Sequence, residues 1–553
     1  MDLTYDCTMF KETFERDYTW LNGFMRNVRR FGYKPAVIDP VAKRQWTYEE
    51  FNADCNRLAN ALKESGVKKN DIIFVQLYNC LPFLHFYVAA QKIGAIFNPA
   101  NFNFSPGETA EIISHNRAKV YAYDTEIADT AVKAIEMSTH KPELTIAVNS
   151  LHRDFTCPQG HTDYDRYTEG RSTENPPVDF SPHIYDEIVR LQTSGTTGTP
   201  KGVPINNINE VLSAHDVIMH FPLNVTDITM NMTPWFHRGG LHSGGPTPTL
   251  YVGAALVIMR TFNPKITLSY IERFGISFIT GVPSILTLLA SRQENHPKNI
   301  SSLKGIVTMG SPLEKEACIR FQKLLSPNIF NGYGTTESFW NTFLRPFDLP
   351  EMSGSAGRSC TDDEVRVVKV YDDKKAEPDE TVPTDNLTEG EVIIHCPAKS
   401  TYCYAGNEQA TREKFYKGWM YTGDIGTWDK KQFITIAGRK DDMIISKGEN
   451  IYPARIEEVL NLHPKVEECI VTGVPDSTRG EVIAAYVIPS DDSLTVSELL
   501  SYCAESPNLS KYQTPKFYRF VSELPRTATG KKQHFVIKNQ AKEDLKNGLL
   551  LKR

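Results

Sequence analysis

The residues best suited to chemistry stand in one short stretch, residues 191–202, which reads Leu-Gln-Thr-Ser-Gly-Thr-Thr-Gly-Thr-Pro-Lys-Gly. Because glycine tolerates positive φ and lets a ligand come close, successive backbone N–H groups in such a loop can converge on an anion. A Walker loop has Gly before its Lys and Ser or Thr after it, whereas Pro200 and Gly202 flank Lys201 here. The stretch therefore predicts a phosphate-binding loop of another kind, with an ordinary polar surface turn as the alternative.

The composition limits the classes of function. With 553 residues, 40% of them hydrophobic and 23% charged, the chain is typical of a soluble globular protein of more than one domain. A net charge of −6 provides no basic field for nucleic acid. The ten cysteines are scattered without a CxxC pair, which favours reduced thiols and a cytoplasmic location. No stretch approaches the ~18 apolar residues of a membrane span, and residues 1–20 are too charged for a signal peptide.

Strands and helices alternate over the first three hundred residues. A helix is expected from 47 to 65, opened by a capping box of Thr47 and Glu50. Apolar runs predict strands at 72–77, 95–98, 118–122, 144–148, 228–232, 256–259, 278–280 and 305–309. Such alternation predicts parallel sheets with crossover helices.

The pattern changes after residue 364. Residues 364–436 are expected to be mostly β-structure, and the charged run 438–442 separates them from a smaller α+β module. In that module Pro453 suits the first turn of a helix, strands are expected at 469–474 and 482–488, and a second helix at 496–505.

Five motifs occur in order along the chain: residues 193–202, Tyr-Gly-Thr-Thr-Glu at 333–337, Tyr-Thr-Gly-Asp at 421–424, Gly-Arg-Lys-Asp at 438–441, and Pro-Arg-Thr-Ala-Thr-Gly-Lys at 525–531. Together they resemble the adenylate-forming superfamily of acyl- and aryl-CoA synthetases, peptide-synthetase adenylation domains and firefly-type luciferases. The resemblance implies an α/β and α+β chain. A large N-terminal domain of mixed β-sheets with helices (1–437) would bind ATP and the acid, followed by a hinge (438–442) and a small mobile lid (443–553).

The resemblance also implies a two-step reaction, in which a carboxylate attacks the α-phosphate of ATP and the acyl group is then transferred. Since an anion attacks an anion, catalysis is charge neutralisation and positioning. Glu337 would hold Mg²⁺, a hard cation that needs only one or two protein carboxylates beside phosphate; a solvated surface Glu is the alternative. The residues implied to bind ATP or AMP are Thr193, Ser194, Gly195, Thr196, Thr197, Gly198, Lys201, Gly310, Ser311, Tyr333, Gly334, Thr335, Thr336, Asp424, Arg439 and Lys531.

Lys531 is the implied catalytic residue of the first step, because an ammonium on a Gly-Lys tip can cancel charge at the reacting phosphate. The family often has Arg three positions later, where this chain has His534. Asp441 matches the hinge position, with Lys440 as the alternative register. For the second step, Lys447 and Gly448 would bind coenzyme A, although relatives often have Gly at the position of Lys447.

The acyl pocket is expected around His237, Gly310, Gly334 and Phe339. His237 in Pro-Trp-Phe-His matches a gate that the family places between acyl pocket and thiol tunnel, so it is a second catalytic candidate. Amino-acid-activating relatives usually have Asp there, so an α-amino acid is not expected. Phe339 and Trp340 favour an aromatic or medium-chain acid. His242 adds a second histidine, but two histidines alone do not make a zinc site.

The leading hypothesis is an acid–thiol ligase that uses ATP, Mg²⁺ and coenzyme A to activate a small carboxylic acid, in the cytoplasm, with a homodimer left open. Three alternatives remain. The enzyme could deliver its adenylate to a separate carrier protein, act as a luciferase-type oxygenase, or bind nucleotide without turnover.

Overall fold

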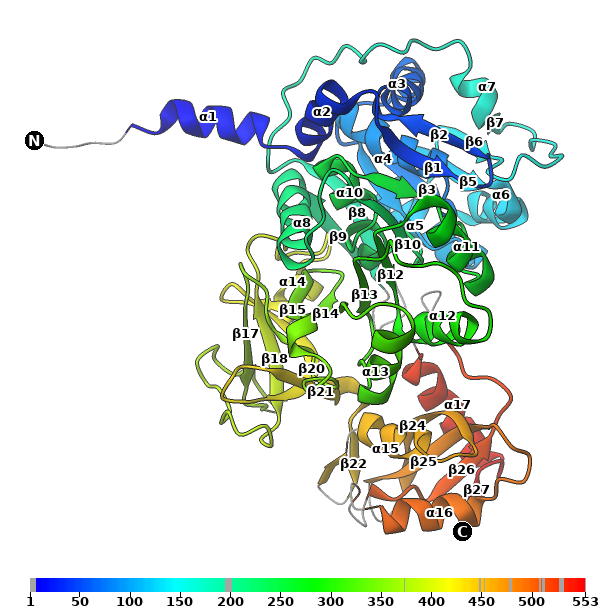
Figure 1. The fold of residues 1–553 in the computed structure, drawn as a ribbon, viewed down its shortest axis with the longest axis vertical. Coiled ribbons are helices and arrows are strands. Elements are labelled where there is room, and N and C mark those ends of the chain that lie inside the picture. Colours follow the sequence, from blue (N-terminus) through cyan, green and yellow to red (C-terminus); the bar gives the residue numbers. More distant parts are fainter. Residues whose placement is uncertain are drawn as a thin grey trace, which may run out of the picture. The chain divides into compact units, whose positions relative to one another are not determined.

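The structure is a computed structural model that describes residues 6–193, 201–371, 373–446, 449–451, 453–476, 480–506, 509, 513–526 and 532–552. The chain divides into two compact units (Figure 1). Unit 1 comprises Met1–Glu364 and His395–Met420, and unit 2 comprises Val365–Ile394 and Tyr421–Arg553. The hinge at 438–442 and the domain boundaries 1–437 and 443–553 stay predictions.

The first sheet of unit 1 has the strand order β7-β6-β5-β3-β4-β8-β9, parallel except for the antiparallel pair β8 and β9. Its strands are β3 (Ile72–Gln76), β4 (Ile96–Pro99), β5 (Val120–Asp124), β6 (Leu144–Val148), β7 (Thr162–Asp163), β8 (Glu187–Thr193) and β9 (Lys201–Asn206). The helices between them are α4 (Leu81–Lys92), α5 (Pro106–Asn116), α6 (Ala128–Met137) and α7 (Tyr164–Thr168). The predicted parallel sheet with crossover helices is confirmed.

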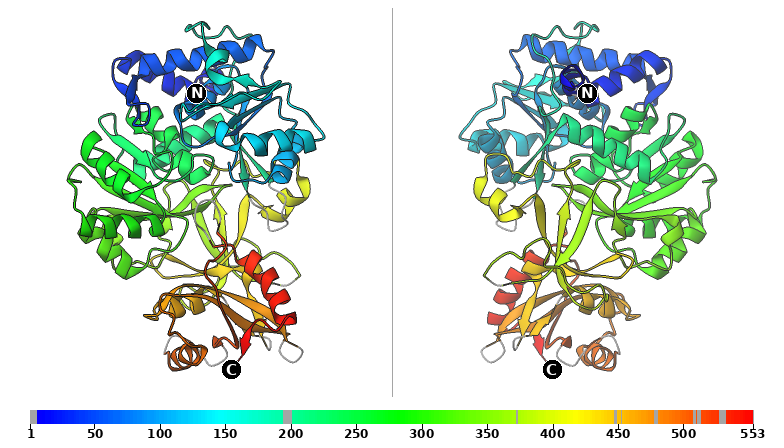
Figure 2. Two further views of the ribbon diagram at one scale, coloured as in Figure 1. Left: turned by 90° about the vertical axis from the view of Figure 1, so that its right-hand side faces the viewer. Right: turned by 90° about the vertical axis from the view of Figure 1, so that its left-hand side faces the viewer.

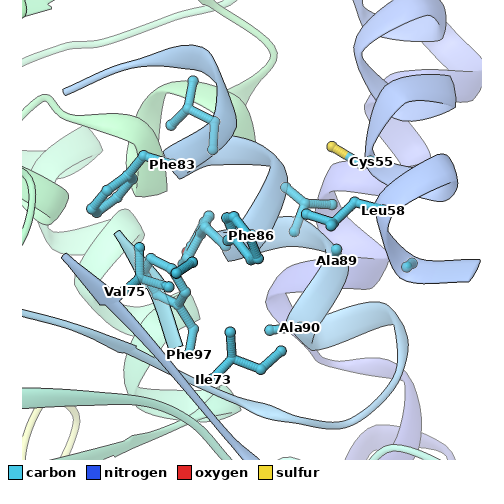
Figure 3. Packing of buried hydrophobic residues seen from close by; sticks show 14 of the residues in the cluster. Cys55, Leu58, Ile73, Val75, Phe83, Phe86, Ala89, Ala90 and Phe97 are labelled. Atoms are coloured by element: carbon cyan, nitrogen blue, oxygen red, sulfur yellow. The ribbon is translucent and has the colours of Figure 1, made fainter. Parts of the chain in front are cut away.

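Helix α3 (Tyr48–Glu64) shows how local signals start an element. The Thr47 hydroxyl accepts a hydrogen bond from the Glu50 backbone N–H at 3.2 Å, and Glu50 accepts one from the Thr47 N–H at 2.9 Å. The predicted capping box is therefore confirmed. Figure 3 shows the core that α3 and α4 form over β3 and β4; its labelled members are Cys55, Leu58, Ile73, Val75, Phe83, Phe86, Ala89, Ala90 and Phe97.

The second sheet of unit 1 has the order β16-β15-β14-β13-β12-β10-β11-β1-β2. Its strands are β1 (Pro35–Asp39), β2 (Arg44–Thr47), β10 (Ile228–Asn231), β11 (Ala255–Val257), β12 (Phe278–Gly281), β13 (Gly305–Met309), β14 (Ile329–Thr335), β15 (Phe339–Leu344) and β16 (Arg358–Ser359). Strands β10, β12, β13 and β14 are parallel and aligned, with Asn231 beside Thr280, Gly281 beside Thr308, and Met309 beside Gly332. Their carboxyl ends therefore meet at one edge, where open α/β sheets bind ligands.

The other helices of unit 1 pack around these sheets, except that α1 has no buried residue and projects from the rest of the unit (Figure 1). They are α1 (Thr8–Asp17), α2 (Trp20–Phe31), α8 (Asn207–His220), α9 (Arg238–His242), α10 (Pro246–Val252), α11 (Pro264–Phe274), α12 (Pro283–Asn295), α13 (Lys315–Leu324) and α14 (Glu408–Lys414).

Unit 2 begins with β17 (Glu364–Val368), β18 (Gly390–His395), β20 (Trp419–Trp428) and β21 (Ile434–Arg439) in one sheet. Trp419 and Met420, the first two residues of β20, belong to unit 1, where they pair with β19 (Phe415–Tyr416). The expected β character of residues 364–436 is confirmed, with α14 as a helical interruption.

The C-terminal sheet of unit 2 has the order β23-β22-β25-β26-β27, with β24 paired to β25. Helices α15 and α17 contact β24, and α17 (red) lies alongside this sheet in Figure 2. The predicted helix start at Pro453 and the predicted helix 496–505 are confirmed. The elements are β22 (Ile444–Ser446), β23 (Glu449–Ile451), α15 (Pro453–Asn461), β24 (Val466–Asp476), β25 (Gly480–Pro489), α16 (Val496–Glu505), β26 (Phe517–Phe520), α17 (His534–Lys546) and β27 (Leu551–Lys552).

Among the described helices, none combines the length and the apolar character needed to cross a membrane.

Candidate active site

The described residues cover only part of the predicted site. Ser194, Gly195, Thr196, Thr197, Gly198, Lys447, Gly448 and Lys531 lie outside them, as does the side chain of Asp441. The backbone of residue 441 belongs to a short 3₁₀ turn, Lys440–Asp442, directly after β21. Predictions about these residues stay predictions.

The glycine-rich stretch joins two paired strands. Thr193 at the end of β8 pairs with Lys201 at the start of β9. The Lys201 ammonium lies 5.4 Å from the centroid of the Tyr404 ring, a distance at which a cation and an aromatic face attract each other. The strand pairing therefore fixes both ends of the stretch, and the Lys201 ammonium lies near an aromatic ring.

Glu337 follows β14 at the carboxyl edge of the second sheet. Its side chain is buried, and its Oε1 accepts a hydrogen bond from the Tyr404 hydroxyl at 2.5 Å. Although burial alone raises it, the charge of Lys414 and hydrogen bonds from Tyr404 and Thr335 hold the pKa of Glu337 below its ordinary value. A buried carboxylate kept ionised in this way has the chemistry of a cation ligand.

We expect Tyr404→Phe to raise the Mg²⁺ concentration for half-maximal activity about 10-fold, because a hydrogen bond to a charged group is lost. The pKa of Glu337 then rises toward its ordinary value, so the variant should lose activity at a higher pH than the wild type as the pH falls. Mg²⁺ titrations at several pH values below 7 check this. Mg²⁺ curves that coincide with the wild type would show that Tyr404 does not act on Glu337.

The β14–β15 hairpin has a steric reason for its glycine near the end of β14. A Cβ on Gly334 would lie 1.5 Å from the Phe339 carbonyl oxygen, and Phe339 itself has a φ of +63°. Phe339 and Trp340 stack with centroids 4.8 Å apart and are buried with Phe221. Gly334 is thus required by the turn whether or not a ligand binds there, and the pocket role of Phe339 stays a prediction.

His237 precedes α9, just beyond the end of β10. Its ring lies 4.3 Å from that of Phe236, and its Nε2 is buried without a hydrogen-bond partner among the described residues. Burial lowers the pKa of His237 to about 4, so the imidazole is neutral near pH 7. Nearby, Gly310 follows β13 with a φ of +84°, and Ser311 is exposed. The parallel strands thus bring His237, Gly310 and Tyr333 to the same sheet edge.

His242 is a structural residue. Its Nε2 lies 2.8 Å from Glu210 Oε2, and its Nδ1 lies 3.1 Å from the Arg238 carbonyl oxygen. Glu210 also accepts hydrogen bonds from Tyr87 and Thr247. Both nitrogens of His242 are therefore engaged within the protein.

In unit 2 the predicted ribose ligands lie together. Asp424 pairs with Arg439 across β20 and β21, and the Arg439 Nη1 donates to Asp424 Oδ1 at 2.8 Å and to the Thr422 carbonyl at 3.1 Å. Gly423 has a φ of +75°, and a Cβ there would lie 3.3 Å from the Arg439 guanidinium. The guanidinium therefore orients a carboxylate whose paired oxygens match a vicinal diol.

Asp424→Ala should raise the KM for ATP about 10- to 100-fold while kcat changes less, because contacts that bind nucleotide throughout the reaction are removed. Steady-state kinetics with varied ATP measure it. A fall in kcat at unchanged KM would show that Asp424 acts in the chemical step instead.

The structure describes the residues on either side of the segment that carries Lys531. The Gln533 N–H donates to the Pro525 carbonyl at 2.9 Å, and Arg526 and Lys532 form an antiparallel bridge. The His534 Nε2 lies 2.7 Å from Oε1 of the buried Glu457, which Lys532 also approaches at 3.5 Å. Although burial alone lowers it, the bond to Glu457 raises the pKa of His534 above its ordinary value. His534 thus anchors this segment at the position where relatives often have Arg.

Sequence reasoning missed Tyr404 and gave Arg238 no role of its own. Tyr404 lies in Cys-Tyr-Ala-Gly, outside the five motifs, and only the fold brings it to Glu337. Arg238 directly follows the predicted gate His237, and this adjacency was the one available signal.

Comparisons with known proteins identify the family of the chain. Residues 24–401 match the family described as AMP-binding enzyme, and residues 455–531 match the AMP-binding enzyme C-terminal domain. The chain is 30% identical to a feruloyl-CoA synthase of an Amycolatopsis species, over 88% of this chain and 92% of the relative. It is also 30% identical to the indoleacetate–CoA ligase of Aromatoleum aromaticum, over 90% and 93%.

Among solved structures, the o-succinylbenzoate CoA synthetase of Bacillus subtilis with its acyl-adenylate intermediate is 26% identical and superposes with a TM-score of 0.80, covering 95% of this chain and 98% of that one. The predicted fold class is confirmed, and so is the predicted superfamily. The chain belongs to the AMP-binding enzyme family.

Proposed function

We propose that this protein is an ATP-dependent carboxylic acid–CoA ligase, which activates an organic acid as acyl-AMP with release of pyrophosphate and then forms the acyl-CoA thioester. The observation that supports this most strongly is the buried, ionised Glu337, hydrogen-bonded to the same Tyr404 ring that Lys201 contacts. Family membership and the CoA-ligase relatives point to the same reaction.

The residues present fit a magnesium–nucleotide complex. Glu337 would hold the cation, because an oxygen ligand that stays ionised while buried is what Mg²⁺ needs. Bound Mg²⁺ supplies charge neutralisation at the phosphates of ATP. Lys201 would screen the phosphates, Asp424 would accept the ribose hydroxyls in the orientation that Arg439 imposes, and Lys531 would approach the reacting phosphate.

We expect the substrate to be an aromatic carboxylic acid, and a medium-chain acid is the second candidate. The relatives named above act on ferulate and indoleacetate by their names. His237 is neutral and offers no carboxylate to an α-ammonium group, which agrees with an acid that lacks one. We place the acid among His237, Gly310, Gly334 and Phe339, at the edge where the parallel strands end.

The test uses the full-length protein with ATP, Mg²⁺ and a panel of acids, with and without coenzyme A. Ferulate, indoleacetate, 2-succinylbenzoate and octanoate are suitable members. We expect acid-dependent release of pyrophosphate and AMP, and a thioester only when coenzyme A is present. Acid-dependent pyrophosphate exchange without thioester formation would favour a carrier protein as the acceptor, light emission would favour the oxygenase, and no exchange with any acid would favour a nucleotide-binding relative without turnover.

The second step is proposed to need rotation at Asp441 and contacts of Lys447 and Gly448 with coenzyme A. Asp441→Pro should reduce thioester formation about 10-fold or more while acyl-AMP forms at a near-normal rate, because proline fixes φ at the pivot. Separate assays of the two half-reactions measure this. Equal rates of thioester formation in variant and wild type would remove Asp441 as the hinge.

A further inference from the structure

Arg238 is a buried cation whose contacts tie together three separate segments of unit 1. Its side chain is 3% exposed. Its Nη1 donates to the Thr336 carbonyl at 2.9 Å, and its Nη2 donates to the Lys399 carbonyl at 2.8 Å and to the Ser213 hydroxyl at 3.2 Å. Because a guanidinium is a rigid planar fork, these contacts fix the Thr336 carbonyl relative to α8 and to the Lys399 backbone.

The Lys399 side chain is itself held by several contacts. The Lys399 ammonium lies 2.9 Å from Asp216 and 2.7 Å from Asp363, and all three side chains are buried. It also donates to the Trp340 carbonyl, so the β14–β15 hairpin is tied to this cluster at two points: β15 directly, and the turn that follows β14 through Arg238. A carbonyl anchored to such a cluster has little freedom to move.

Within the described part of the chain, the charge of Arg238 lacks a direct counterion. No described carboxylate forms an ion pair with it, and its Nε is buried without a hydrogen-bond partner there. Glu210 and Glu337 act on it only through space. Burying an unpaired charge is costly, so the position is expected to serve something other than stability alone.

We propose that Arg238 is a positioning residue for the magnesium ligand Glu337: it fixes the preceding Thr336 carbonyl and so couples the acid side of the site, where His237 directly precedes α9, to the nucleotide side. This inference rests on the proposed function, in which Glu337 holds Mg²⁺. The positive charge also favours the ionised form of Glu337 and an anionic ligand beside it.

The test compares Arg238→Met and Arg238→Lys with the wild type in acid-dependent pyrophosphate exchange. For Arg238→Met we expect the half-saturating concentration of Mg·ATP to rise about 10- to 100-fold, since hydrogen bonds from a charged group to the Glu337 segment are lost. Arg238→Lys keeps the positive charge but loses the forked guanidinium. Its half-saturating concentration of Mg·ATP should therefore lie between those of the wild type and Arg238→Met. Methylguanidine added to Arg238→Ala should restore part of the activity, whereas methylammonium should restore less.

Arg320→Met is the matched control, because Arg320 on α13 forms an exposed pair with Glu294 and lies outside the site. Its kinetics should equal those of the wild type. A well-folded Arg238→Met with unchanged Mg·ATP dependence would overturn the inference. If Arg238→Met does not fold, Arg238→Lys decides: less than about a two-fold shift would overturn it as well. Absence of exchange in the wild type would instead refute the proposed function, so the two failures are distinguishable.

Discussion

Lys531→Ala is expected to slow acyl-adenylate formation by about three orders of magnitude and to leave thioester formation from supplied acyl-AMP far less affected. The first step brings a carboxylate against the α-phosphate, and one ammonium that cancels the developing charge acts most strongly in the transition state. In the second step the adenylate already exists, so that charge is no longer needed. Pyrophosphate exchange and single-turnover thioester formation measure the two steps separately.

The control for this variant is Lys542→Ala, which removes an exposed lysine from α17 in the same C-terminal module. It should behave as the wild type in both half-reactions. Equal losses in the two half-reactions of Lys531→Ala would contradict its assignment to the first step. Glu457→Gln gives a graded comparison, because it weakens the bonds of Lys532 and His534 at the base of the segment and leaves Lys531 in place.

Glu337→Gln should lower kcat/KM for Mg·ATP about 100-fold or more, because the amide keeps the shape of the side chain but removes the charge that holds the cation. The folded-state pKa of Glu337 is depressed, so its ionised form contributes to stability above the ordinary carboxyl pKa, and this contribution is lost as the pH falls through the depressed value. The wild type should therefore keep its Mg²⁺ response down to a more acidic pH than an exposed Glu would allow.

Two measurements check this prediction. Mg²⁺ titrations of pyrophosphate exchange give the change in cation affinity, and thermal unfolding with and without Mg·ATP shows whether the variant still gains stability from the nucleotide. If the substitution leaves both measurements unchanged, Glu337 is only a buried partner of Tyr404 and holds no cation.

Much of the fold was predictable because its signals are local. The capping box of Thr47 and Glu50 lies within four residues, and the strands of the two parallel sheets are short apolar runs bounded by helices. Pro453 at the start of α15 is equally local. The motif residues Asp424 and Arg439 were predicted separately, and the pairing of β20 with β21 explains why they meet.

The remainder depended on contacts between distant segments. Nothing near Tyr404 in the sequence shows that its hydroxyl reaches Glu337, and nothing near Arg238 shows that its fork reaches Thr336. Gly334 belongs to a motif that was predicted to bind nucleotide. The structure shows a second reason for glycine at this position, because the Phe339 carbonyl lies too close to leave room for a Cβ. His534 departs from the family pattern, and only the fold shows that Glu457 meets it.

In the proposed reaction, the carboxylate oxygen of the acid attacks the α-phosphate of ATP. An acid labelled with ¹⁸O in both carboxylate oxygens tests this directly when it is incubated with the protein, ATP, Mg²⁺ and coenzyme A and the products are analysed by mass spectrometry. We predict one ¹⁸O atom in each AMP released and none in pyrophosphate. Unlabelled AMP formed together with the thioester, or label in phosphate or pyrophosphate, would show that the reaction does not proceed through this attack.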